Sequence, residues 1–141
     1  MVKSILVSLD GSEYSERALT IARELAKATG ARIDLISVAL RYKEAHVPPV
    51  EKLDEQTRQR ILDYLMPHLD AIKQDGIQAG GHIAHGAPSE EIVRQARESA
   101  ADLIVMSTHG IGATGLHALG SVAMKVLETA PCPVLMVRIP Q

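Results

Sequence analysis

The chain has 141 residues with 46% hydrophobic and 23% charged residues, which fits one globular domain over residues 1–141 and excludes the disordered and collagen-like classes. The net charge is −2, Lys and Arg are not clustered, and no apolar run reaches the roughly 18 residues that span a bilayer, so we expect neither nucleic-acid binding nor membrane insertion. Cys132 is the single cysteine and the N-terminus lacks a signal-peptide layout, which together predict a cytoplasmic protein.

Strands and helices alternate along the chain. In chain order we expect a strand at residues 5–9, a helix at 13–29, a strand at 32–40, a loop at 41–50, a long helix from 53 to about 75, a strand at 77–85, a helix opened by residues 86–89, a strand at 103–106, a loop at 107–119, a helix at 120–129 and a strand at 134–137. Pro67 predicts a kink or a break within the long helix. Three methionines, Met106, Met124 and Met136, are expected in the core because of their spacing.

This order of elements predicts an α/β fold: a single doubly wound open sheet of five mainly parallel strands, with helices on both faces. The segment 103–106 is so apolar that its strand is expected inside the sheet. In such sheets, ligands bind beyond the carboxyl ends of the strands, where the strand order reverses. Asp10, residues 38–41 and the chain from Ser107 onward are therefore candidate ligand contacts.

A glycine-rich segment follows the fourth predicted strand. Four glycines lie within the eleven residues from Gly110 to Gly120, and a helix is expected to start directly afterwards. Glycine lets backbone N–H groups approach a ligand closely, and a helix N-terminus adds free donors and a partial positive charge. The segment is therefore a candidate phosphate cradle, and a surface loop without a ligand is the alternative.

Two better-known phosphate motifs fit this segment poorly. Residues 110–115 match the dinucleotide pattern G-x-G-x-x-G, but they follow the fourth strand and no carboxylate lies about 20 residues later. Residues 115–121 match a Walker loop except that the lysine is missing. Neither a dinucleotide-binding enzyme nor a P-loop ATPase is expected.

As a whole, the segment resembles the nucleotide-binding motif of the universal stress protein family, which is G-x-x-G, nine residues, then G-[ST]. Gly110 and Gly120-Ser121 match this motif in register, whereas Ser107 stands in the position of its leading glycine. Residues 5–12, 85–88 and 130–137 are also similar to the first strand and turn, the entry to the third helix and the closing strand of that family. The resemblance covers nearly the whole chain.

The resemblance implies a stress-response regulatory protein that binds ATP or another adenine nucleotide. It places Ser8, Leu9 and Asp10 beside the adenine and ribose, Val38 against the adenine, Met106, Ser107, His109 and Gly110 around the ribose and phosphates, and Gly120, Ser121 and Val122 against the phosphates. The segment 107–121 contains no Lys or Arg, so we expect Mg²⁺ to accompany the nucleotide.

The sequence shows no general base and no phosphate-clamping arginine, which predicts little or no hydrolysis. A slow ATPase or nucleotidyl-transfer enzyme is one alternative, and a nucleotide-free dimeric scaffold is another. A homodimer is expected through the C-terminal strand, because the resemblance implies it and an apolar edge strand needs a cover. An unknown protein partner is also possible for a regulatory protein.

Several residues with reactive side chains are expected to have ordinary structural roles. Ser12 is expected to cap the first helix, and Asp10 has the alternative role of a turn former before a glycine. His82 and His85 are three residues apart in a strand, so they face opposite sides and no metal site is expected. Cys132 lies between two prolines and is expected to be a small connector residue.

Overall fold

The computed structural model describes residues 1–40, 53–110 and 119–138. Its five strands form one parallel sheet in the order β3-β2-β1-β4-β5. The strands are β1 (Ser4–Ser8), β2 (Arg32–Leu40), β3 (Ala79–Gly86), β4 (Leu103–Ser107) and β5 (Val134–Val137), and the helices are α1 (Glu13–Thr29), α2 (Glu55–Gln74), α3 (Pro88–Glu98) and α4 (Ser121–Thr129). The predicted loop at 41–50 and residues 111–118, with Gly112 and Gly115, lie outside the described residues.

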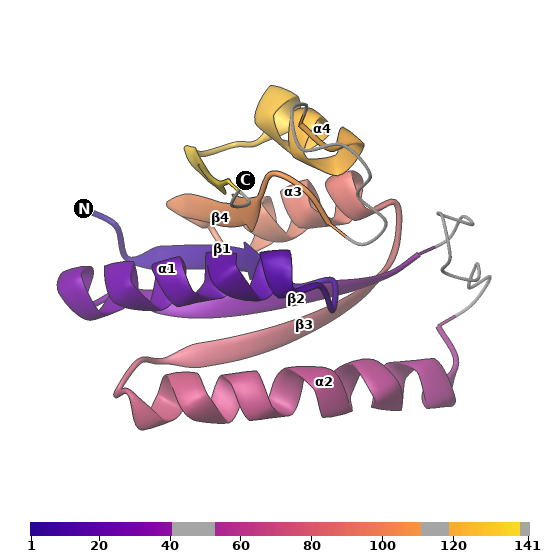
Figure 1. Cartoon of the computed structure of the whole chain (residues 1–141), viewed down its shortest axis with the longest axis horizontal. Helices are drawn as coiled ribbons and strands as arrows, with labels where there is room; N and C mark the ends of the chain where they lie inside the picture. Colours follow the sequence, from indigo (N-terminus) through magenta and orange to yellow (C-terminus); the bar gives the residue numbers. More distant parts are fainter. Residues whose placement is uncertain (41–52, 111–118, 139–141) are drawn as a thin grey trace.

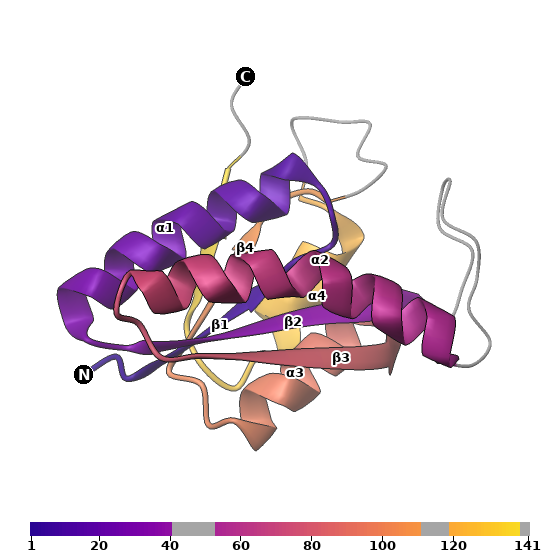
Figure 2. The same ribbon diagram turned by 90° about the horizontal axis from the view of Figure 1, so that it is seen from below.

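Helices cover both faces of the sheet, as expected for a doubly wound fold. Helices α1 and α2 lie on one face, and α3 and α4 lie on the other (Figures 1 and 2). Alternate residues of β1 and β2 enter the two cores: Ile5 and Leu35 lie on the α1–α2 side, and Leu6 and Ile36 lie on the α3–α4 side. The predicted fold class is confirmed, and β4 is an interior strand between β1 and β5.

Helix α1 begins and ends where the sequence predicts. Ser12 is its N-cap and accepts a hydrogen bond from the N–H of Ser15. At the other end, Gly30 has a φ of 78°, and its N–H donates to the carbonyl of Ala26. A side chain would be strained at this φ, so glycine is the residue that suits this helix end.

The predicted break in α2 and the predicted burial of Met124 are both wrong. Helix α2 continues through Pro67 as one helix. Pro67 is exposed, so water can reach the carbonyl of Asp63 that loses its intrahelical partner. Met124 is 50% exposed because the buried stripe of α4 runs through Ala123 and Val126 instead, whereas Met106 is buried and Met136 packs against the core.

A buried ionic cluster lies on β2 and β3, which the apolar pattern of β2 did not predict. Asp34 is 3% exposed, and Arg32 donates to it from Nη2 to Oδ1 at 2.9 Å and from Nε to Oδ2 at 3.0 Å. His82 Nε2 lies 3.2 Å from the same Oδ1. The hydrogen bonds that Arg32 donates to Asp34, and the negative charge of that carboxylate, raise the pKa of Arg32. The cluster compensates a carboxylate that would otherwise be costly to bury.

The other reactive side chains have ordinary surroundings. Cys132 is half-buried, and burial followed by the charge of Asp102 raises the pKa of its thiol, which supports its reading as a connector residue. His82 and His85 are separated by an odd step along β3, so they project from opposite faces of the strand. In the part of the chain that the structure describes, no helix is long and apolar enough to cross a membrane.

Candidate functional site

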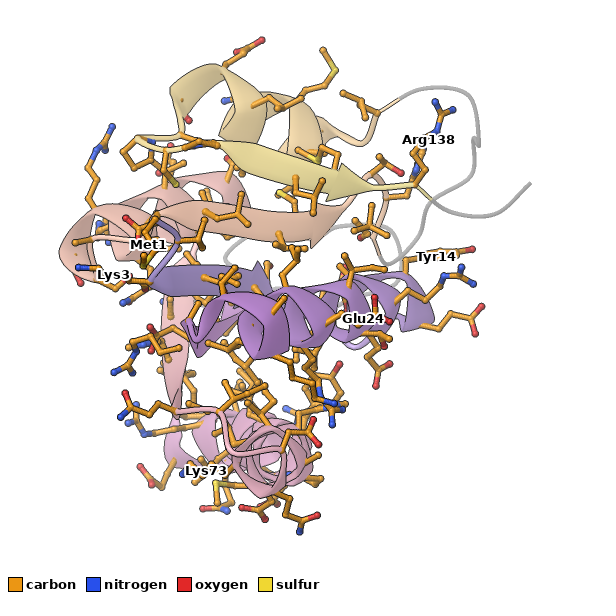
Figure 3. All side chains as sticks on the ribbon, turned by 90° about the vertical axis from the view of Figure 1, so that its left-hand side faces the viewer. Met1, Lys3, Tyr14, Glu24, Lys73 and Arg138 are labelled. Atoms are coloured by element: carbon orange, nitrogen blue, oxygen red, sulfur yellow. The ribbon has the colours of Figure 1, made fainter. Side chains whose placement is uncertain are left out.

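The strand order reverses between β1 and β4. These two strands are neighbours, with Ile5 beside Leu103 and Val7 beside Val105, while the chain continues from β1 toward β3 on one side and from β4 to β5 on the other. The expectation that the first and fourth strands flank the switch point is confirmed. Figure 3 shows Tyr14 and Arg138 at this carboxyl end of the sheet and Lys3 at the opposite end.

The turn after β1 holds the carboxylate of Asp10 in a defined position. Asp10 Oδ1 accepts hydrogen bonds from the N–H of Ser12 at 2.9 Å and from the Ser12 hydroxyl at 2.5 Å. The N–H of Asp10 donates to Ser15 Oγ at 3.3 Å, and Gly11 supplies the turn with a φ of 88°. Asp10 is thus the turn former that its sequence context suggested. Its carboxylate is also exposed at the end of β1.

Asp10 and Gly110 are in direct contact across the switch point. A Cβ atom added to Gly110 would lie 2.3 Å from Asp10 Oδ2, so the space for any side chain at Gly110 is already filled by this carboxylate. The contact joins the acidic turn of β1 to the glycine segment of β4. A carboxylate acceptor and a half-buried glycine therefore lie side by side at the switch point.

Hydrogen bonds hold the residues that follow β4 in place. The Ser107 hydroxyl donates to the carbonyl of His109, so the side chain at the position of the leading glycine is engaged with its own loop. Thr108 Oγ1 lies 2.9 Å from His109 Nδ1, and the N–H of Thr108 donates to Val137 of β5 at 3.1 Å. His109 is 8% exposed, and its Nε2 has no hydrogen-bond partner among the described residues.

Helix α4 points its N-terminus at this end of β4. Gly120 is the N-cap, has no side-chain capping bond, and donates its own N–H to the carbonyl of Thr108 at 2.8 Å. This bond uses the N–H that the sequence analysis assigned to phosphate. Ser121 and Val122 are the first two residues of the helix, where N–H groups lack intrahelical acceptors and carry the positive end of the helix dipole.

The other candidate residues border the same region, but their side chains differ in accessibility. Leu9 and Met106 are buried in the two cores, so each can offer a ligand little except its backbone. Ser8 and Val38 are half-buried at the ends of β1 and β2. Val38 packs against the α3–α4 core and leaves part of its surface uncovered.

Arg138 is a cation at this end of the sheet that the sequence analysis did not include. It follows β5 directly, and Val137 of that strand is paired with Ser107 of β4. Arg138 is exposed and lies near the carboxyl ends of the strands (Figure 3). Arg138 lies outside the segment 107–121 in the sequence, and only the register of β5 against β4 brings it beside that segment.

A parallel doubly wound sheet with an acidic turn and a glycine segment at its switch point is the architecture of α/β domains that bind their ligands at this edge of the sheet. The chain matches the model of the universal stress protein family over residues 1–138 and therefore belongs to that family. It is 35% identical over 144 residues to a universal stress protein from Thermus aquaticus, named for its place in the QAH/OAS sulfhydrylase 3′ region, with 98% of this chain and 100% of that protein covered.

Solved structures agree with this assignment. The universal stress protein UspA from Lactobacillus plantarum superposes with a TM-score of 0.83 at 25% identity, covering 97% of this chain and 98% of that one. A universal stress protein in complex with cAMP superposes with a TM-score of 0.74 at 25% identity, covering 97% of each chain.

Proposed function

We propose that this chain is a stress-response regulatory protein of the cytoplasm that binds ATP, or another adenine nucleotide, together with Mg²⁺. The observation that carries the proposal is the contact between Asp10 and Gly110, which brings a carboxylate acceptor to the glycine segment at the switch point. Ribose hydroxyls need such an acceptor, and phosphates need backbone that they can approach closely. The complex of a relative with cAMP, itself an adenine nucleotide, supports this choice of ligand.

In the proposed complex, the nucleotide runs across the carboxyl ends of neighbouring strands, from β2 over β1 to β4. The adenine lies toward the uncovered part of Val38, the ribose hydroxyls donate to Asp10, and the phosphates lie along Gly110 and the start of α4. The N–H groups of Ser121 and Val122 are the donors for the phosphates, because the N–H of Gly120 is engaged by Thr108. Gly120 therefore contributes by letting the phosphates approach the backbone closely, and not by donating a hydrogen bond to them.

The charge of the nucleotide calls for a metal ion. The segment 107–121 carries no Lys or Arg, so the described backbone offers partial charges only, and Arg138 is a cation that the register of β5 against β4 adds. Mg²⁺ bound to the phosphates would neutralise the remaining charge. The missing Walker lysine and the lack of arginine in the segment 107–121 are the reasons for proposing a regulatory protein instead of an ATPase or a nucleotidyl transferase.

Calorimetry of the full chain with ATP and Mg²⁺ tests this function. We expect Mg²⁺ to strengthen the binding of ATP more than that of AMP, and turnover to stay far below the roughly 1 to 1000 per second of typical enzymes. Denaturing the purified protein should release an adenine nucleotide. If neither binding heat nor released nucleotide is found, the chain is a nucleotide-free scaffold. A steady-state rate of about one per second or faster would make it an enzyme.

We also propose a homodimer that pairs through β5. This strand has a neighbour on one side only within the described sheet, and its Leu135 is 38% exposed. Sedimentation at micromolar concentration should show a species of twice the 15.2 kDa chain mass. Leu135→Lys should shift it to the monomer because the lysine charge would be buried on pairing. Leu62→Lys, at a leucine of α2 that is 37% exposed, is the matched control and should remain dimeric.

A single 15.2 kDa species in the unmodified protein would contradict the dimer. Equal dissociation by both lysine variants would place the interface elsewhere than β5.

A further inference from the structure

We propose that Arg138, the residue that follows β5, selects nucleotides by their number of phosphates, by pairing with the terminal phosphates of ATP. The inference rests on the proposed nucleotide binding and adds a preference for the triphosphate over the monophosphate. Arg138 belongs to none of the sequence segments that predicted the site. The place of β5 in the sheet, the direction of the side chain and its charge lead to this assignment.

The backbone at Arg138 is fixed beside the end of β4. Val137 is the register partner of Ser107. Its carbonyl, which belongs to the peptide bond with Arg138, accepts the N–H of Thr108 at 3.1 Å. The carbonyl of Thr108 in turn accepts the N–H of Gly120 at 2.8 Å. Two successive backbone hydrogen bonds therefore connect the start of Arg138 to the N-cap of α4, where the phosphates are proposed to lie.

Arg138 projects from the face of the sheet that α4 covers. Along β5, Val134 and Met136 pack against the α3–α4 core, whereas Val137 packs against the α1–α2 core. Successive side chains of an extended chain point to opposite faces, so the residue after Val137 returns to the α4 side. In Figure 3, Arg138 extends from the end of β5 toward the layer that contains α4. Its guanidinium is therefore on the same side of the sheet as the N-terminus of α4.

The charge of Arg138 is not used within the described part of the chain. Its side chain is exposed, and the ion pairs between described residues involve other cations. The carboxylate of Asp10 follows β1, and β4 lies between β1 and β5. A guanidinium keeps its charge throughout the physiological pH range, and its planar fork of donors matches two phosphate oxygens. Arg138 can therefore supply the side-chain cation that the segment 107–121 lacks.

The order of the strands decides which phosphates reach Arg138. The proposed nucleotide runs from the adenine at β2, over the ribose at β1, to the first phosphate at β4, and β5 is the next strand in the same direction. Neighbouring strands lie about 4.8 Å apart, a distance that a triphosphate spans and a monophosphate does not. Each added phosphate therefore extends the ligand toward Arg138, and the single phosphate of AMP stays at β4.

The variant Arg138→Gln tests this assignment, because it removes the charge and keeps a polar side chain. In calorimetry of the full chain with Mg²⁺ present, ATP should bind about tenfold more weakly or worse, as for a lost hydrogen bond to a charged group, whereas AMP should bind as before. ADP should lie between the two. Arg138→Lys should recover part of the ATP affinity, because the charge returns without the planar fork.

The matched control is Arg97→Gln. Arg97 is also exposed, but it lies in the last turn of α3 and not at the carboxyl ends of the strands. This variant changes the net charge by the same amount and should leave the affinities for ATP, ADP and AMP unchanged. Both glutamine variants should keep the melting temperature of the unmodified protein, because each replaces an exposed side chain.

Equal weakening of ATP and AMP by Arg138→Gln would overturn the inference, because such a loss does not depend on the number of phosphates. Unchanged ATP affinity would also overturn it and would leave the proposed function intact. A similar loss of ATP affinity in Arg97→Gln would assign the effect to net charge instead of the position of Arg138, and would overturn the inference as well. If the unmodified chain binds no adenine nucleotide, both proposals are wrong.

Discussion

Replacement of Gly110 by alanine is expected to weaken the binding of ATP with Mg²⁺ by about 1.5–3 kcal/mol, the range for a hydrogen bond to a charged group. The added methyl group would lie 2.3 Å from Asp10 Oδ2 and must displace the carboxylate. A carboxylate on a short side chain can rotate away, so the fold should survive. The rotation would break its bonds to Ser12 and remove the acceptor proposed for the ribose.

The measurement is calorimetry on three proteins: Gly110→Ala, Asp10→Ala and the double variant. Each single variant should lose a similar amount of binding free energy, and the double variant should lose little more than Asp10→Ala alone, because the methyl group then has nothing to displace. Circular dichroism should show an unchanged fold in all three. Unaltered affinity in Gly110→Ala would mean that Asp10 does not bind the ribose. Fully additive losses would mean that Gly110 acts independently of Asp10.

Replacement of Gly120 by valine is expected to abolish nucleotide binding, a loss of about 3 kcal/mol or more, because several charge-assisted bonds at the phosphates depend on this position. A Cβ atom there would lie 3.2 Å from the carbonyl oxygen of Thr108, which already accepts the N–H of Gly120 at 2.8 Å. Valine adds two methyl groups to this contact. They would push α4 away from β4 and cover the N–H groups of Ser121 and Val122.

Ala87→Val is the matched control for this variant. Ala87 is the N-cap of α3, has an extended backbone like that of Gly120, and likewise makes no side-chain capping bond. The control should leave binding unchanged, so a loss confined to Gly120→Val cannot be a general effect of a branched residue at a helix start. Gly120→Ala should lie between the unmodified protein and Gly120→Val. If Gly120→Val binds ATP as well as the unmodified protein, the phosphates do not lie at α4.

The sequence was sufficient to predict most of the fold, because its signals are local. Short apolar runs with helical segments between them predicted five parallel strands, and the structure confirms their order along the chain. The ends of α1 were predicted to the residue, since Ser12 and Gly30 are the residue types that helix ends prefer. The start of α4 was predicted to within one residue, since the helix was expected from Gly120 and begins at Ser121.

Which side chains of an element are buried was harder to predict. Met124 has the spacing of a core residue and is half exposed, because α4 turns its smaller residues toward the sheet. Asp34 stands in an apolar strand and is buried, because Arg32 and His82 converge on it from β2 and β3. Both outcomes depend on which neighbours pack on an element, and periodicity within the element carries no information about them.

The sequence by itself determined the class of this protein, the candidate ligand and the segments that would form the site, since glycine spacing and strand ends are local features. Only the tertiary structure decided how these segments meet. It placed Asp10 against Gly110, engaged the N–H of Gly120 with Thr108, and brought Arg138 beside the end of β4. These contacts join residues far apart in the chain. They depend on strand order and register, which are set by the packing of the whole sheet and not by any one segment.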